Sequence, residues 1–442
     1  MANPYLPNWE YIPDGEPRVF GDRVYVYGSH DIAGSDRFCD FKLKVWSASV
    51  DNLNQWTCHG VSFQTKSDSA RKADTDWTER ELYAPDVVEK DGKYYLYAYI
   101  LGSKGCVAVS DKPEGPFQLI STYQYPESLT GEIKDGQFVD PGVLVDDDRR
   151  VYIYCGYLKS YMAELNAENM TEVIEGSYQE DIIPVAQPFE FFEACSPRKI
   201  GDTYYMIYSQ IPDHCSRLVY ATSKSPTGPF EYRGVIVDNG IEYPAGNNHG
   251  SICKIKDQWY IFYHRMTNDT IMSRRGCVEK IAILPDGSIP QVETTSLGFE
   301  EALSPFKVTP ADLACVLTGG AFITERNIFS RLITNITSGC IAGYKYYDFG
   351  ADFSGTPMRC FLKIRGTGGR GKISIILDDY NGKPIASGVI GSDDAIVTLE
   401  LKRITGRHAV YFKFEDMYVD NGLTQTLRNR TLCELEEFVF EI

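Results

Sequence analysis

Five polar side chains recur at one place in a repeated pattern, and they are the residues best suited to chemistry. Each stands about ten residues before a strand rich in aromatic side chains: Asp14 before Tyr25, Asp86 before Tyr95, Asp140 before Tyr152, Glu193 before Tyr205 and His249 before Tyr260. The gaps are 11, 9, 12, 12 and 11 residues. A single acidic residue most often faces water or caps a turn. Five polar residues in the same register of five units instead predict a shared site.

Asp14, Asp140 and Glu193 form a set that could split an acetal. Cleavage of a glycosidic bond needs one protonated carboxyl to assist the leaving group and one ionised carboxylate to activate water or attack carbon. A third carboxylate nearby raises the pKa of the acid by like-charge repulsion and orients it. Carboxyls about 6.5–9.5 Å apart leave room for a water, and the reaction then inverts the anomeric configuration.

The elements that position these residues repeat along the first two thirds of the chain. In each unit a short segment begins at the polar residue, a turn follows, and an apolar or alternating strand comes next. The turns are Gly21-Asp22, Asp91-Gly92, residues 146–148, Gly201-Asp202 and Lys256-Asp257. Such residues tolerate the backbone of tight hairpins. The stretches 110–117 and 223–230 are near-duplicates ending in Gly-Pro-Phe. These repeats predict a five-bladed β-propeller, with the five polar residues at one mouth of its channel.

The repetition stops near residue 289, and strand-like runs without the inner polar residue follow at 359–364, 372–377, 409–414 and 435–442. We therefore predict an all-β chain with a propeller in residues 1–304 and a β-sandwich (jelly-roll) domain in residues 305–442. The glycine-rich stretch 366–372 is predicted to be a hairpin turn. It is not a nucleotide-binding loop, because Ile373 replaces the Ser or Thr that such a loop needs after its Lys.

Composition excludes several classes of function. The 442 residues carry a formal net charge of −17 and 43% hydrophobic residues. This balance, with no basic stripe, argues against nucleic acid and anionic membranes as partners. The twelve cysteines include no Cys-x-x-Cys pair and are predicted to be reduced. No basic-then-apolar leader is evident at the N-terminus, so a cytoplasmic location is expected.

Several motifs together resemble glycoside hydrolase family 43. They are Pro13-Asp14-Gly15, Ala84-Pro85-Asp86, Val139-Asp140-Pro141, Phe192-Glu193-Ala194 and Asn248-His249-Gly250, in this order over roughly the first 300 residues. The resemblance implies a five-bladed propeller of inverting enzymes acting on arabinose- and xylose-containing glycans. It also implies Asp14 as general base, Glu193 as general acid and Asp140 as the residue that modulates and orients the acid. The C-terminal part resembles a family 6 carbohydrate-binding module.

Four further residues are predicted to bind substrate: Asp86, Trp77, His30 and Arg274. Arg274 resembles the family's sugar-contacting arginine, although the neighbouring Arg275 leaves the assignment open by one position. Trp77 could stack on a sugar or simply pack in a loop. His249 resembles an axial histidine near calcium, so calcium held mostly through water is predicted there, with a water-bonded histidine as the alternative. No organic cofactor is expected.

The sequence thus predicts an exo-acting glycosidase that releases α-L-arabinofuranose, β-D-xylose or both from arabinoxylan- or xylan-derived oligosaccharides. Two alternatives stay open, namely an endo-arabinanase or galactofuranosidase of the same fold, and a propeller that binds carbohydrate without cleaving it. The sequence leaves the oligomeric state open. It also leaves open whether Tyr344, Tyr346 and Tyr347 bind sugar or pack internally.

Overall fold

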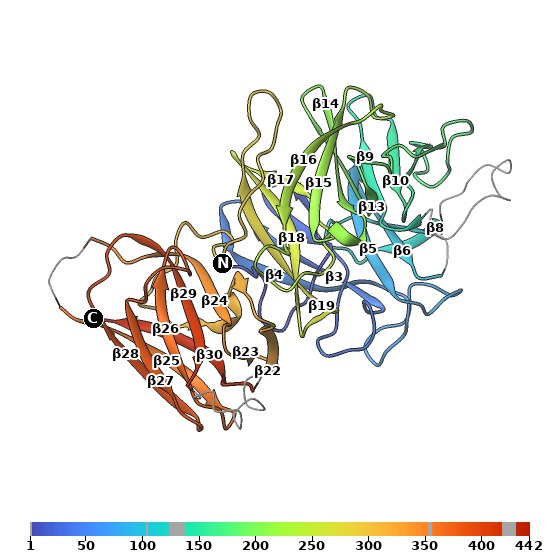
Figure 1. Cartoon of the computed structure of the whole chain (residues 1–442). Coiled ribbons are helices and arrows are strands. Elements are labelled where there is room, and N and C mark those ends of the chain that lie inside the picture. Colours follow the sequence, from blue (N-terminus) through green and yellow to red (C-terminus); the bar gives the residue numbers. More distant parts are fainter. Residues whose placement is uncertain (1, 103–104, 123–137, 352–355, 418–429) are drawn as a thin grey trace.

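The regular secondary structure of the described residues is almost wholly β-strand. The computed structural model describes residues 2–102, 105–122, 138–351, 356–417 and 430–442. Two short 3-10 turns lie within them, η3 (Pro212–His214) and η4 (Ala311–Leu313). None of the described helices is long and apolar enough to cross a membrane. Strands β1–β19 gather at one end of the molecule and strands β20–β30 at the other (Figure 1).

The first 281 residues form five successive antiparallel sheets, each built from strands consecutive in sequence. Four sheets have four strands and the fifth has three. The strands of the first two sheets are β1 (Glu16–Phe20), β2 (Arg23–Tyr27), β3 (Lys42–Ser49), β4 (Asn52–Gln64), β5 (Leu82–Lys90), β6 (Lys93–Ile100), β7 (Cys106–Ser110) and β8 (Gln118–Thr122). Those of the third and fourth are β9 (Gly142–Val145), β10 (Val151–Cys155), β11 (Tyr161–Leu165), β12 (Gln179–Glu180), β13 (Phe191–Ile200), β14 (Thr203–Gln210), β15 (Arg217–Ser223) and β16 (Glu231–Asp238). The fifth holds β17 (Ile252–Ile255), β18 (Gln258–Thr267) and β19 (Thr270–Ile281).

All five predicted turns join the first and second strands of a sheet, so the hairpin predictions are confirmed. The turn residues allow a tight reversal, and the apolar second strands, such as β10 and β14, are buried along almost their whole length. The first strand of each sheet therefore has its register set by its hairpin. This places the polar residue that precedes the first strand or lies in its first half at the same end in each sheet.

Buried ion pairs tie the first strands of different sheets together. Arg18 of β1 contacts Asp86 of β5 at 2.6 Å and also donates to the carbonyl oxygen of Val143 in β9. Arg198 of β13 contacts Glu16 of β1 at 2.6 Å and donates to the carbonyl oxygen of Ile252 in β17. A parallel bridge joins Gly15 to Gly250, next to β1 and β17. Side chains of β1 and β13 thus reach the first strands of the other three sheets.

The C-terminal strands form two further antiparallel sheets. One follows the order β22 (Phe322–Asn327), β23 (Ser330–Ile336), β30 (Cys433–Glu441), β25 (Met358–Gly366) and β28 (Ala395–Leu401), with β20 (Thr309–Pro310) paired to β30. The other follows β21 (Val316–Leu317), β24 (Ile341–Asp348), β29 (Arg407–Asp416), β26 (Gly371–Leu377) and β27 (Ala386–Ile390).

One expectation about this region is wrong. The glycine-rich stretch after β25 is not a hairpin turn, because β25 pairs with β28 and β30 whereas β26 pairs with β27 and β29. The stretch therefore carries the chain from one sheet to the other. Tyr344 and Tyr347 lie in the hydrophobic core of this part, whereas Tyr346 donates to Glu293 at 2.7 Å. Two of the three tyrosines thus pack internally.

Candidate active site

Four of the five recurring polar residues line one cavity of about 360 Å³, a size usual for a small-molecule site. Asp14, Asp140, Glu193 and His249 come from the starts of four different sheets, and Arg274 of β19 joins them. The rest of the lining is largely apolar or aromatic: Phe38, Tyr83, Tyr99, Leu101, Val139, Tyr157 and Asn247. Acidic groups far apart in sequence thus meet in a pocket with aromatic walls.

The backbone at two of these acids is held in the left-handed region. Asp14 has φ 58° and Asp140 has φ 51°. Aspartate adopts this conformation more readily than most residues, yet it is uncommon and concentrates at functional sites. At Asp14 the N–H donates to Nδ1 of His264 at 3.3 Å. This bond helps to fix the direction of the Asp14 side chain.

Asp14 is buried beside positive charge. Arg274 donates from Nη1 to Oδ1 of Asp14 at 2.9 Å. The same guanidinium is gripped from its other edge by Asp31, which accepts from Nε at 2.9 Å and from Nη2 at 3.0 Å. Burial alone would raise the pKa of Asp14, but the charges of Arg274 and His249 outweigh it and lower that pKa. Asp14 is therefore ionised near neutral pH and can act as a base.

Glu193 lines the same cavity as Asp14 but is held in the opposite protonation state. It stands near the start of β13, between two register irregularities that interrupt pairing with β14. Such bulges re-aim a side chain away from the regular alternation of a strand. Burial, and next the negative charge of Asp140, raise the pKa of Glu193 to about 8. Glu193 therefore keeps its proton near neutral pH and can donate it.

Two histidines flank the acids and differ in charge. His249 has Nδ1 at 3.4 Å from Asp140 and 3.9 Å from Asp14. Burial opposes its protonation, but Asp140 outweighs burial and raises the pKa of His249 to about 9. Burial and then Arg274 lower the pKa of His264 to about 3. Neutral His264 accepts from Asp14 on Nδ1, so its Nε2 carries the proton and donates to the carbonyl oxygen of Asn247 at 2.9 Å.

The described residues offer calcium few direct ligands. Calcium prefers six to eight oxygen ligands. No group of three or more His, Cys, Asp and Glu within the described ranges is arranged to hold a metal ion. His249 turns Nδ1 toward Asp140, and a protonated imidazole cannot ligate a metal. The residues present therefore fit a directly ligated calcium poorly, and a calcium here would take most of its ligands from water.

Three predicted substrate-binding residues are not among the described residues that line this cavity. Asp86 is fully buried and paired with Arg18, where it also accepts from the N–H of Val143. His30 is held between Glu10 and Asp40 at 3.0 and 3.2 Å. Trp77 is 43% exposed. Arg274, in contrast, lies in the cavity, whereas Arg275 pairs with Asp312 at 2.7 Å.

Several residues of the site do not stand at the recurring position of the five repeated units, so the repeat pattern does not identify them. His264 lies within the aromatic strand β18 and Phe38 lies in a loop, so neither occupies the recurring position. Phe38 lies under the guanidinium of Arg274, whose Cζ is 4.3 Å from the ring centroid. Asp31 follows β2 in a short polar run beside His30, but the run does not reveal its partner Arg274, which is 243 positions away.

A second cavity of about 630 Å³ adjoins the first. The two share Phe38, Tyr157, Glu193 and Asn247. The second is otherwise lined by residues that include Phe192, Ile271 and Met272, and it contains neither Asp14 nor Asp140. Glu193 thus stands where the two cavities meet.

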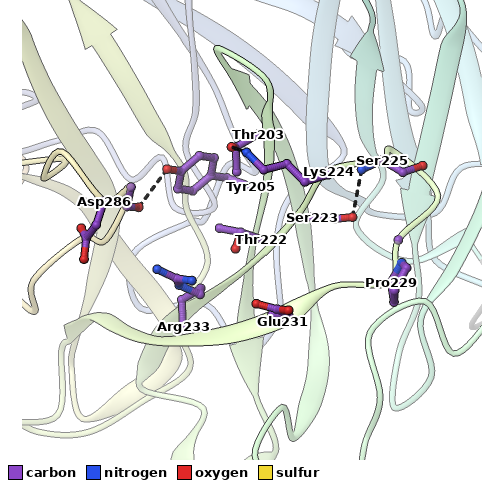
Figure 2. Close-up of a pocket in the computed structure, with 12 residues that line it drawn as sticks. Thr203, Tyr205, Thr222, Ser223, Lys224, Ser225, Pro229, Glu231, Arg233 and Asp286 are labelled. Carbon is purple, nitrogen blue, oxygen red and sulfur yellow. Dashed lines mark hydrogen bonds between the residues drawn. The ribbon is translucent and has the colours of Figure 1, made fainter.

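Another pocket, of about 510 Å³, lies on the fourth sheet (Figure 2). In it Tyr205 donates to the carbonyl oxygen of Gly287 at 2.8 Å, and Glu231, Arg233 and Asp286 are exposed. Hydrogen bonds from Ser288 lower the pKa of Asp286. This pocket is open to solvent. None of the described residues that line it forms a pair of carboxyls with one ionised and one protonated, as Asp14 and Glu193 do in the first cavity.

Comparison with known proteins places the chain among glycosidases. The family model for glycosyl hydrolases family 43 matches residues 12–289. A xylosidase/arabinosidase from Thermoclostridium stercorarium is 41% identical over 405 residues, which cover 78% of this chain and 82% of that protein. A beta-xylosidase from Xylanibacter ruminicola is 30% identical over 66% of this chain and 100% of its own length.

Solved structures agree with this placement. A family 43 β-xylosidase/α-arabinofuranosidase from a compost microbial metagenome, in complex with xylotriose and in a calcium-free form, is 28% identical with a TM-score of 0.54, covering 66% of this chain and 98% of that one. An arabinoxylan arabinofuranohydrolase from Bacillus subtilis in complex with cellotetraose has a TM-score of 0.55 and 23% identity, covering 99% of this chain and 97% of that one. At this identity the second likeness concerns the fold.

Proposed function

Because the chain belongs to glycosyl hydrolases family 43, we propose that it is an inverting, exo-acting glycosidase releasing α-L-arabinofuranose, β-D-xylose or both from arabinoxylan- or xylan-derived oligosaccharides. The observation that carries this proposal is the pair of carboxyls that line one cavity, Asp14 held ionised and Glu193 held protonated. Two carboxyls in opposite states are what glycoside hydrolysis requires. Relatives with the names xylosidase/arabinosidase and beta-xylosidase support the choice of sugars.

Each charged group has a part in the proposed reaction. Glu193 protonates the leaving glycosidic oxygen while Asp14 takes a proton from the attacking water on the opposite face of the sugar ring. Asp140 raises the pKa of Glu193, and the His249 cation beside Asp140 keeps that carboxylate in place. Arg274 keeps Asp14 ionised. Because Glu193 stands where the cavities meet, the first holds the sugar that is released and the second holds the leaving group.

The proposal extends to the fold that carries the site. The five sheets are the blades of a propeller, supported by the Gly15–Gly250 bridge and by the ion pairs between first strands. We divide the chain into a catalytic propeller, residues 1–304, and a β-sandwich resembling a family 6 carbohydrate-binding module, residues 305–442. The two C-terminal sheets and the likeness to a solved arabinofuranohydrolase over 99% of the chain support this division.

Calcium stays a prediction for this chain. One structural neighbour was solved in a calcium-free form, which points to calcium in the family. A calcium near His249 would lower the pKa of that imidazole, since both carry positive charge. Activity of chelator-treated enzyme with and without added calcium tests it. Calcium at this site raises activity, and an unchanged rate removes calcium from the proposal.

A screen of nitrophenyl pentosides, with NMR of the anomer first formed, tests substrate and stereochemistry together. Inversion gives β-L-arabinose from an α-L-arabinofuranoside and α-D-xylose from a β-D-xyloside. Retention of configuration would overturn the assignment of Asp14 as a base acting on water. Release of single sugars from the non-reducing end of a linear xylo-oligosaccharide checks the exo-acting mode.

A further inference from the structure

The β18–β19 hairpin stands between the active-site cavity and the C-terminal part of the chain. Adjacent residues of β19 point in opposite directions, as strand geometry requires. Arg274 reaches Asp14 and Asp31 on the cavity side. Arg275 reaches Asp312 on the other side at 2.7 Å, and both members of this ion pair are at most 1% exposed. One strand thus carries a cavity arginine and an arginine anchored in the C-terminal part.

A second arginine strengthens the anchor. Arg265 of β18 is the cross-strand neighbour of Arg275, so both side chains lie on the same face of the hairpin. Arg265 donates to the carbonyl oxygen of Ala314 at 3.1 Å. Residues 311–314 therefore meet two buried cations. Removing the partner of a buried charge is strongly destabilising, so these contacts strongly constrain the hairpin.

The tip of the hairpin is held by the C-terminal part as well. Asn268 donates from its backbone N–H to the carbonyl oxygen of Ile323 at 2.7 Å and from Nδ2 to Glu325 at 2.8 Å. Ile271 and Met272, three and four residues further on, line the second cavity. Contacts from β22 therefore fix the segment that shapes the leaving-group side.

A third contact from the C-terminal part supports Asp31, the second carboxylate that binds Arg274. Arg331 of β23 donates to the hydroxyl of Tyr11 at 2.7 Å. The carbonyl oxygen of Tyr11 accepts from the N–H of Asp31 at 3.0 Å. Asp31 and Arg274 are therefore both backed by residues of the C-terminal part.

We propose that the C-terminal part is a positioning element of the active site, with Asp312 holding Arg274 on the base Asp14 and Glu325 holding the Ile271–Met272 wall of the leaving-group cavity. The naming of the two cavities rests on the proposed function. The consequence is that the strands after residue 305 are required for turnover of small substrates, whether or not they bind carbohydrate.

Two variants separate the role of Asp312, which is to hold Arg274 on Asp14, from the role of Glu325, which is to hold the Ile271–Met272 wall. In Asp312→Asn the partner charge of Arg275 is lost, so Arg274 shifts and the pKa of Asp14 rises. The acid limb of the pH–activity profile then moves to higher pH, and kcat/KM falls by about 10- to 100-fold. In Glu325→Ala the tip of the hairpin loosens, so KM for xylobiose rises several-fold. Glu325 also accepts from the hydroxyl of Tyr11, so KM is the readout for this variant. The control is Arg326→Met, which breaks a pair with Glu436 within the C-terminal part and should change neither limb nor KM.

A double variant and an independent signal keep the test decisive. If Asp312→Asn does not fold, Arg275→Met with Asp312→Leu removes both charges, and such replacements often preserve stability. It should keep the wild-type Tm and still lose kcat/KM. Wild-type kcat/KM and acid limb in a folded variant at Asp312 would overturn the proposal. The pKa of Asp14, followed by carbon-13 NMR, should rise in Asp312→Asn even if no pentoside proves to be a substrate, so failure of the proposed function is seen separately.

Discussion

Replacing Asp140 by asparagine should move the alkaline limb of the pH–activity profile to lower pH. Burial and the Asp140 charge together raise the pKa of Glu193 from 4.5 to about 8. Loss of the proton from Glu193 ends acid catalysis, so activity of the wild type falls as pH rises through about 8. Asparagine keeps the shape of the side chain at position 140 and removes its charge.

The size of the expected fall in the pKa of Glu193 follows from its two causes, burial and the charge of Asp140. The whole rise in the pKa of Glu193 corresponds to about 5 kcal/mol in favour of the protonated carboxyl. Burial is the larger cause and remains in the variant, so the pKa falls without returning to 4.5. A charge at close range accounts for about one to three pH units. With a fall of about two units, protonated Glu193 at pH 7 drops from about 90% to about 10%, and the rate drops about tenfold from this cause alone.

The assay is kcat/KM for xylobiose between pH 4 and pH 10, because a sugar leaving group depends fully on protonation. The matched control is Asp148→Asn, which changes an exposed aspartate in the turn between β9 and β10. The control should keep the wild-type alkaline limb. An Asp140→Asn enzyme that is folded and active, with its alkaline limb still near that of the wild type, would refute the reasoning that Asp140 helps to hold the proton on Glu193.

Three further results are expected. Glu193→Ala should lose about 10²- to 10⁴-fold of kcat on xylo-oligosaccharides but much less on nitrophenyl glycosides, whose leaving group needs little protonation; equal losses on both would contradict the acid assignment. Asp14→Ala should lose nearly all turnover on both substrates, measured under the same conditions. Gly250→Ala should lower Tm by several degrees, because an added Cβ would lie 1.9 Å from the carbonyl oxygen of Phe262 and overpacking costs about 1–3 kcal/mol. Gly391→Ala, where a Cβ meets nothing within 4 Å, is its control.

Local signals account for what the sequence could predict of the fold. Turns such as Asp91-Gly92 join apolar strands, and both features act within a few residues, so the hairpins could be assigned directly. The recurring position singled out Asp14, Asp140, Glu193 and His249 for the same reason. The stretch 366–372 has the composition of a hairpin turn, but the partners of its flanking strands are set by distant strands, which composition does not report.

Long-range pairing explains what the sequence could not predict of the site. Asp86 occupies the same position as the other acids, but Arg18 reaches it from β1 and makes it part of the ion pairs between first strands. His249 precedes β17, and His264 lies within the aromatic strand β18. Only the three-dimensional neighbours show that His249 is a cation beside Asp140, whereas His264 is a neutral acceptor for the N–H of Asp14. The Asp140 charge that keeps His249 protonated lies more than a hundred residues away in sequence, whereas burial and Arg274 keep His264 neutral.

The opposite states of Asp14 and Glu193 need a cause other than burial. Both carboxyls line the same cavity, and their removal from bulk water raises the pKa of each. What separates them is the sign of the nearest charge, which is Arg274 for Asp14 and Asp140 for Glu193. Arg274 keeps its Nη1 on Asp14 because Asp31 holds the other edge of the guanidinium and Phe38 lies against its face. The division of labour between base and acid therefore depends on how firmly one arginine is held, which is why residues that touch no sugar should alter the pH dependence of the reaction.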